Sequence, residues 1–255
     1  PSYFEYTTGM VLQAYDELNQ VAPEARYADA VQTVMGSFVN EDGSINGYVQ
    51  EKYNIDSIRA GTMLLRMYER NQDPAYKKAV DTLFEQLEHH PRTSAGAFWH
   101  KKIYPYQVWL DGVYMGIPFL AQYEQLMHEE PNVEEVLAEF KVVNETLKDP
   151  ETGLFYHAWD EKREQVWADK ETGLSGYHWA RGMGWLAMAL VDVLDYIPQE
   201  NTEERQYLLD MITEIAPVIA KYQDPETGTW WQIIDKPGKR ANYLESTAST
   251  MFTYF

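Results

Sequence analysis

Two kinds of helical segment alternate along this chain, and this alternation restricts the fold more than any other feature. Residues 74–90 and 133–148 are amphipathic and charged, so one face of each meets water. Residues 110–123 carry only Asp111 as a charge, and residues 182–190 carry none. A helix that is apolar all round is buried on every side. The pattern therefore predicts an all-α fold, with an inner ring of helices inside an outer ring.

Helical periodicity predicts about nine helices, and strand-like alternation is weak. The nine are expected at about residues 7–19, after Pro23, and at 56–70, 74–90, 111–127, 133–148, 178–196, 202–222 and from 245 to the end. Outer helices follow inner ones after short turns. Inner helices follow outer ones after long loops, at residues 40–55, 91–110, 149–177 and 224–244. In a ring of up-down hairpins these loops share one end, where we expect the functional site.

A short repeat supports successive hairpins. The run Asp149-Pro150-Glu151-Thr152-Gly153 recurs 75 residues later, from Asp224 to Gly228. Asp-Pro followed by Gly stops a helix and makes a turn, and both copies follow an outer helix. Nine helices make four and a half hairpins, whereas a closed ring of six hairpins needs twelve. We therefore expect residues 1–255 to form a single toroid domain that is truncated at its C-terminus. An open solenoid arc is the structural alternative.

Composition excludes several classes of function. The net charge of −19 argues against nucleic acid and anionic membrane surfaces as partners. Because the chain as a whole would repel an acidic substrate, binding such a substrate requires cationic residues that are concentrated at the binding site. The chain has no cysteine, so disulfides and thiolate metal sites are excluded. No metal-binding or nucleotide-binding motif occurs, and no run of about 18 apolar residues predicts a membrane span. We expect neither a metal nor another cofactor.

Unusual polar residues occur where the inner helices begin. Asp56, Asp111, His178 and Arg181 all lie at the long-loop end and are expected to converge on one mouth. Either aspartate is equally consistent with a helix N-cap. Arg181, in an otherwise uncharged helix, needs an anionic partner, which is either an internal carboxylate or the carboxylate of a substrate.

Two histidines and a lysine lie among aromatic residues in the long loops. His100 and Lys101 precede Tyr104 and Trp109, and His157 follows another aromatic pair. Cations interleaved with aromatic rings suit a subsite for an acidic sugar. A solvated loop has the same composition, so the residues alone leave both interpretations open.

Three stretches resemble glycoside hydrolase family 105, the unsaturated rhamnogalacturonyl hydrolases. They are Asn54-Ile55-Asp56, Trp109-Leu110-Asp111-Gly112-Val113-Tyr114-Met115-Gly116 and His178-Trp179-Ala180-Arg181-Gly182-Met183-Gly184-Trp185. The resemblance implies an (α/α)6 toroid of which about nine of twelve helices are present. It also implies that Asp111 is the general acid/base and Asp56 the second acidic residue. The residues implied to line the sugar subsite are Tyr6, His100, Lys101, Trp109, His157, Arg181 and Trp185.

The resemblance implies release of a terminal 4,5-unsaturated uronic acid from pectin-derived (rhamnogalacturonan) oligosaccharides by hydration of the C4=C5 bond. It also implies a bacterial protein of the cytoplasm or periplasm. The alternatives are an unsaturated glucuronyl hydrolase acting on glycosaminoglycan fragments, an inverting glycosidase using Asp56 and Asp111, and an epimerase using His157 and His178. A non-enzymatic helical-repeat module that binds carbohydrate is a further alternative.

Overall fold

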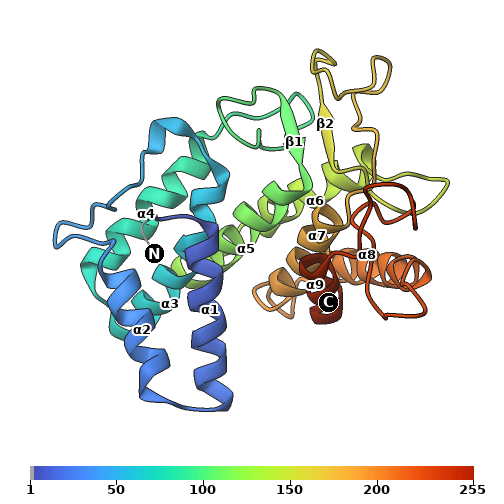
Figure 1. The fold of residues 1–255 in the computed structure, drawn as a ribbon. Helices are drawn as coiled ribbons and strands as arrows, with labels where there is room; N and C mark the ends of the chain where they lie inside the picture. Colours follow the sequence, from blue (N-terminus) through green and yellow to red (C-terminus); the bar gives the residue numbers. More distant parts are fainter. Residues whose placement is uncertain (1–2) are drawn as a thin grey trace.

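The computed structural model describes residues 3–255, and this part of the chain contains the nine predicted α-helices (Figure 1). They are α1 (Tyr6–Val21), α2 (Ala25–Gly36), α3 (Gly61–Asn71), α4 (Pro74–His89), α5 (Leu110–Met127), α6 (Val133–Thr146), α7 (Ala180–Leu194), α8 (Thr202–Lys221) and α9 (Ser246–Tyr254). Two short 3-10 helices, η1 (Gln50–Lys52) and η2 (Ile55–Ala60), precede α3. The prediction of an α-helix from Asp56 is therefore wrong for its first turn, which is η2.

The helices form two concentric layers. The inner layer runs α1, η2 with α3, α5, α7 and α9, each packed against the next, and the outer helices α2, α4, α6 and α8 each pack on the inner helix that precedes them. Helices α5 and α7 are buried along most of their length, whereas α8 buries only one stripe of residues. This difference in burial follows from the apolar surface of the inner helices. It confirms the predicted alternation of inner and outer helices along the chain. No described helix combines the length and apolar character that crossing a membrane requires.

Glycines allow the inner helices to approach closely. A Cβ on Gly9 of α1 would lie 2.7 Å from the Cα of Ala60, and one on Gly184 of α7 would lie 2.6 Å from the sulfur of Met251 in α9. The first contact is with backbone, which cannot move aside cheaply. Small residues at these crossings therefore set the distance between neighbouring inner helices.

A two-stranded sheet joins two of the long loops. Strands β1 (Gln107–Trp109) and β2 (Ala158–Asp160) are antiparallel, with Trp109 opposite Ala158. They lie along the upper side of the molecule in Figure 1, opposite the turn between α1 and α2. The sequence did not predict these strands, because three-residue strands carry too little alternation to detect. They tie the loop before α5 to the loop before α7.

The repeated turns have the expected structure. Asp149 accepts hydrogen bonds from the Glu151 N–H and the Thr152 hydroxyl, and Asp224 accepts equivalent bonds. The structure adds a copy that the sequence analysis missed, Asp169-Lys170-Glu171-Thr172-Gly173, with the same Asp–Thr bond and a left-handed glycine (φ 81°). This copy lies within a hairpin rather than after a helix, so it does not follow the 75-residue period.

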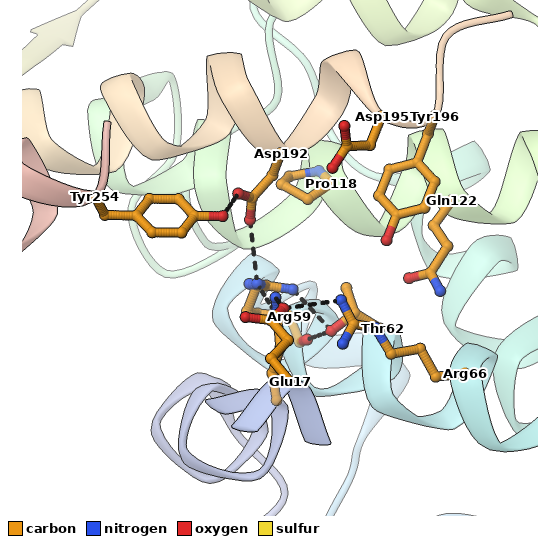
Figure 2. A pocket seen from close by; sticks show the side chains of 11 residues that line it. Glu17, Arg59, Thr62, Arg66, Pro118, Gln122, Asp192, Asp195, Tyr196 and Tyr254 are labelled. Carbon is orange, nitrogen blue, oxygen red and sulfur yellow. Dashed lines mark hydrogen bonds and ion pairs between the residues drawn. The ribbon is translucent and has the colours of Figure 1, made fainter. Parts of the chain in front are cut away.

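A buried arginine in η2, three residues after Asp56, joins the inner helices. Arg59 is 1% exposed, and its guanidinium donates to Thr62 Oγ1 (2.7 Å; Figure 2). It also donates to Tyr114 Oη (2.7 Å) and to Gln13 Oε1. Its Nη2 atom also lies 3.7 Å from the Asp192 carboxylate. One cation thus connects α1, η2, α3, α5 and α7.

Asp192 extends this network to the last helix. Its carboxylate accepts hydrogen bonds from Tyr114 Oη (3.1 Å) and from Tyr254 Oη of α9 (2.7 Å). A cavity of about 40 Å³ lies beside these side chains. The network joins polar groups of six inner elements, and a charged centre of this kind costs stability when one member is removed.

Glu139 is a buried carboxyl group in the outer helix α6. It is 2% exposed, and it accepts a hydrogen bond from the Phe98 N–H (3.0 Å) in the loop that leads to His100. Burial raises the pKa of Glu139 from 4.5 to about 7, while the Phe98 N–H and Arg92 act in the opposite direction and Glu135 adds to the rise. Ionisation of this group is therefore unfavourable in the folded state.

Replacing Glu139 by glutamine is expected to remove a pH-dependent loss of stability. The pKa of Glu139 is higher in the folded state than in the unfolded state. Its contribution to the free energy of unfolding is therefore complete below pH 4.5 and is lost as the pH rises through about 7. At pH 8 the variant should exceed wild type by about 3 kcal/mol in unfolding free energy, and below pH 5 by almost nothing. Urea unfolding across this range measures the difference. The exposed Glu145→Gln is the control, and an equal pH dependence in wild type and Glu139→Gln would contradict the assignment.

Candidate functional site

The predicted residues gather where the inner helices begin, and neither aspartate is an N-cap. Asn54 caps η2 by accepting from the Asp56 N–H, so Asp56 lies inside the first turn. Helix α5 begins at Leu110 after Trp109, and Asp111 also lies in the first turn. Both carboxylates are therefore free of capping bonds. The N-cap alternative is excluded for these two residues.

Asp56 is held by two neighbouring residues of the loop before β1. Its carboxylate lies 2.7 Å from Lys101 Nζ and 3.3 Å from His100 Nε2. Backbone contacts fix this arrangement, because the Ile55 N–H donates to the His100 carbonyl and Asn54 bridges to Lys101. The loop that could have been a solvated turn is thus an ordered wall of the site.

Asp111 and His157 face each other across β1 and β2. Asp111 Oδ2 lies 3.4 Å from His157 Nδ1, and neither atom has a hydrogen-bond partner in the described part of the chain. The Asp111 side chain retains 18% exposure. A Cβ on Gly182 would lie 3.0 Å from His157 Nδ1, so the absence of a side chain there leaves room for the imidazole. The unpaired oxygen is itself shielded from solvent, so a ligand can reach only the remaining, exposed part of the Asp111 side chain.

Burial raises the pKa of Asp111 from 3.8 to about 7. The negative charge of Asp56 raises the pKa of Asp111 further. The backbone N–H of Asp111 itself and the cations Arg181 and Lys101 lower it. A carboxyl group with a pKa near neutrality can be protonated at working pH and can both give and take a proton. This is the electrostatic condition for a general acid/base.

The two histidines of the mouth are uncharged at neutral pH. Burial lowers the pKa of both His100 and His157 to about 4, and the charge of Arg181 lowers that of His157 further. The positive charge that an acidic ligand requires therefore comes from Lys101 and Arg181. Lys101 is paired with Asp56 and Arg181 with Glu245, so these pairs keep the mouth close to neutral within a chain whose net charge is −19.

Aromatic rings line the same mouth. Trp109 stacks with His100 (centroids 4.3 Å apart) and with Tyr104 (5.1 Å). Tyr6 from α1 meets Trp185 of α7 edge to face at 6.1 Å, and carboxylates including Asp56 and Asp111 contribute to raising the pKa of Tyr6, after burial itself. Helices far apart in the sequence thus bring Tyr6 close to the two carboxylates, whereas Trp185, predicted to line the subsite, is only 5% exposed and contacts the ring of Tyr6 from the core.

Arg181 has an internal partner that the sequence analysis did not identify. Its Nη1 lies 2.9 Å from Glu245 Oε1, and its guanidinium stacks over Trp179 at 4.3 Å. Glu245 is 8% exposed at its side chain and caps α9 by accepting from the Ala248 N–H. Arg181 itself remains 33% exposed. Of the two partners predicted for Arg181, the internal carboxylate is present, and the charge of Arg181 also acts on Asp111 and His157.

His178 lies apart from this group. Its ring nitrogens lie 3.4 Å from Asp149 and 3.4 Å from Asp235, and its ring contacts Tyr156. His157 instead contacts Asp111 and Trp179. The two imidazoles therefore serve different partners, which does not support the histidine pair of the epimerase alternative. No cluster of three potential metal ligands occurs among residues 3–255.

Comparisons with known proteins identify the family. The family model described as Glycosyl Hydrolase Family 88 matches residues 2–255. The chain is 30% identical over 203 residues to the unsaturated rhamnogalacturonyl hydrolase YesR of Bacillus subtilis, covering 77% of this chain and 55% of YesR. It is 38% identical over 144 residues to protein Atu3128 of Agrobacterium fabrum, covering 55% of this chain and 58% of that protein. The chain thus spans little more than half the length of these relatives.

Solved structures agree with this result. A family 105 glycoside hydrolase of C. acetobutylicum superimposes with a TM-score of 0.95 and 37% identity, over 99% of this chain and 70% of that one. A possible family 105 member from Salmonella enterica gives a TM-score of 0.83 at 27% identity, over 98% of this chain and 63% of that one. The prediction of an incomplete (α/α)6 toroid is confirmed. The chain belongs to the glycoside hydrolase group that comprises families 88 and 105.

Proposed function

We propose that this protein removes a terminal 4,5-unsaturated uronic acid from rhamnogalacturonan-derived oligosaccharides, with residues 1–255 acting as one catalytic domain. The observation that carries the proposal is the Asp111 carboxyl, whose pKa near 7 makes it both donor and acceptor. Lys101 and Arg181 supply positive charge for the uronate carboxylate. The 30% identity to a rhamnogalacturonyl hydrolase supports the pectin-type substrate.

The C4=C5 bond of such a sugar is an enol ether, so hydration is the route we infer. Protonated Asp111 donates its proton to C4, and the resulting carboxylate takes a proton from water as the hydroxyl adds to C5. The product is a hemiketal at C5. Opening of its ring leaves a hydroxyl on C1, and C1 then releases the remaining oligosaccharide as an alcohol. One water is consumed, and Asp111 ends protonated as it began.

The other residues have positioning roles in this proposal. His157 lies 3.4 Å from Asp111 and is neutral, so it can hold the attacking water without competing for the proton. Asp56, ion-paired with Lys101, places negative charge near Asp111 and helps to keep it protonated. Tyr6 and Trp109 provide aromatic surface for the sugar ring, and the buried Trp185 supports the ring of Tyr6.

The test follows the ultraviolet band of the conjugated enol ether during incubation with unsaturated oligosaccharides from a rhamnogalacturonan lyase digest. Loss of the band at a rate proportional to protein concentration is the expected result. Loss only with glycosaminoglycan-derived disaccharides would instead assign the glucuronyl hydrolase alternative. Turnover of saturated substrates with an unchanged band would assign an inverting glycosidase, and binding without turnover would assign a carbohydrate-binding module.

Replacing Glu245 by glutamine is expected to raise KM for the unsaturated uronide about 3- to 10-fold while leaving kcat within about twofold. The ion pair with Glu245 orients Arg181. Glutamine keeps an oxygen for the α9 cap, so the loss is specific to the charge. Steady-state kinetics measure the effect, and an unchanged urea midpoint checks that the fold is retained. A variant with wild-type KM would show that Arg181 needs no such support.

A further inference from the structure

Trp179 is the N-cap residue of α7, where Ser, Thr, Asp and Asn are preferred because their side chains accept a hydrogen bond from the helix. A tryptophan side chain has no acceptor atom, and Trp179 makes no capping bond. The residue lies in the stretch 178–185 that resembles family 105, but it is not among the residues implied to line the subsite. Its side chain is half-buried. The indole ring therefore serves something other than the end of the helix.

The Trp179 ring contacts two residues of the catalytic mouth. It meets the His157 imidazole edge to face, with ring centroids 4.7 Å apart and planes at 82°. The guanidinium carbon of Arg181 lies over the same ring, 4.3 Å from its centroid. A cation over an aromatic face is attracted by the ring quadrupole, and tryptophan gives the strongest attraction of this kind. One side chain thus joins the imidazole beside Asp111 to a cation that the proposed reaction uses for the uronate carboxylate.

A second N-cap tryptophan contacts His157 from the start of α5. Trp109 makes no capping bond either, and its ring centroid lies 5.6 Å from that of His157 at an interplanar angle of 53°. The Leu110 N–H donates to the His157 carbonyl (3.0 Å), which fixes the backbone of His157 at the same helix start. The imidazole therefore has one tryptophan from each of two neighbouring inner helices, and its orientation depends on both rings.

Gly182 leaves the space that this packing needs. A Cβ at this position would lie 3.0 Å from His157 Nδ1 and 3.4 Å from Cε3 of Trp179. Even a methyl group would therefore crowd both rings. The close approach of α7 to the two side chains depends on the absence of a side chain at residue 182.

The backbone on either side of Trp179 is held by the loop before α9. The Ala180 N–H donates to the Gln232 carbonyl (2.8 Å), and the Ile234 N–H donates to the His178 carbonyl (3.1 Å). These bonds fix the base of the Trp179 side chain before any ligand binds. A preorganised ring loses little entropy when a ligand arrives, so it can hold its neighbours in place at low cost.

We propose that Trp179 is a positioning residue that holds the imidazole of His157 and the guanidinium of Arg181 in their working orientations. This inference rests on the proposed function. Trp179 acts through these two residues and takes no part in the proton transfer at Asp111. The ion pair with Glu245 fixes one end of the Arg181 guanidinium, and stacking on Trp179 fixes its plane. Loss of the ring should therefore affect both binding and turnover, whereas loss of the Glu245 charge is expected to affect KM alone.

Trp179→Leu should raise KM for the methyl glycoside of the unsaturated uronate about 3- to 10-fold, because the guanidinium loses its ring. It should also lower kcat about tenfold or more, because the imidazole beside Asp111 is no longer held. Trp179→Phe keeps a smaller aromatic face and should lose only about two- to threefold in each, and it carries the test if Trp179→Leu does not fold. Trp167→Leu, the same change at an exposed tryptophan, is the matched control and should behave as wild type. Wild-type KM and kcat in folded Trp179 variants would overturn the inference.

A second measurement needs no turnover. Burial and the charge of Arg181 lower the pKa of His157 to about 4, so in wild type its NMR signals should not titrate between about pH 5.5 and 8. Trp179→Leu admits water to the ring, and the pKa of His157 should rise toward its ordinary value of 6.5. His100, which is buried against Trp109, should keep its pKa of about 4 and is the internal control. An unchanged His157 titration would overturn the inference even if the reaction stands.

The role assigned to Trp179 toward Arg181 is tested with the same signals. Because the positive charge of Arg181 lowers the pKa of His157, Arg181→Gln should raise this pKa in wild type. If Trp179 holds the guanidinium in place, the rise should be smaller in the Trp179→Leu background. Equal rises in the two backgrounds would overturn the inference. The smaller rise, found in a protein that turns over no unsaturated uronide, would overturn the proposed reaction and support the contacts assigned to Trp179.

Discussion

Asp111→Asn is expected to lower kcat/KM on an unsaturated uronide by about 10²–10⁴-fold, the usual contribution of a positioned acid/base. Asparagine has nearly the same shape but neither donates a proton to carbon nor accepts one from water. The ultraviolet assay measures the loss. Asp224→Asn, in the exposed repeat turn, is the matched control and should keep wild-type activity. A variant with more than a tenth of wild-type kcat/KM would exclude Asp111 as the proton donor.

The pH dependence gives a second measurement on the same residue. Because the pKa of Asp111 is raised to about 7, its acid form prevails below that pH, and the rate should fall about tenfold per pH unit well above it. The stability effect has the opposite consequence. Asp111 makes its full contribution to the free energy of unfolding below pH 3.8, and this contribution is lost as the pH rises through about 7. Asp111→Asn should therefore be more stable than wild type at pH 8. Greater stability with lost activity is typical of a functional carboxyl group. A change in stability with no turnover by either wild type or Asp111→Asn would instead favour the carbohydrate-binding module.

Arg59→Met is expected to lower the unfolding free energy by about 3–5 kcal/mol, because it leaves a buried carboxylate without its cation. Methionine fills a similar volume, so the loss is not a cavity effect. Asp192 would keep only the hydroxyls of Tyr114 and Tyr254. Gln13 would lose its donor as well. Urea unfolding at pH 7 measures the change.

The double variant Arg59→Met with Asp192→Asn provides the control. Removing both charges leaves no unpaired ion, so the double variant should recover part of the stability that Arg59→Met loses. Strictly additive losses would mean that the two groups do not interact. A loss below about 1 kcal/mol for Arg59→Met would show that the network contributes no more than an exposed ion pair.

The periodicity of the chain determined its architecture. Residues 182–190 have no charge and can only be buried, whereas residues 133–148 need water on one face, so the order of inner and outer helices follows from the hydrophobic effect alone. The lengths of the loops likewise indicated one functional end. Asp56, Asp111 and Arg181 were found because a charge at the start of an apolar helix is unusual.

Only the tertiary structure decided the electrostatics and the partners. The pKa of Asp111 depends on how much water its neighbours exclude, which no local pattern encodes. The pairing of Arg181 with Glu245 joins residues 64 positions apart. Periodicity reports whether a face is buried, because burial repeats along a helix, whereas a contact between two loops depends on the path of the whole chain.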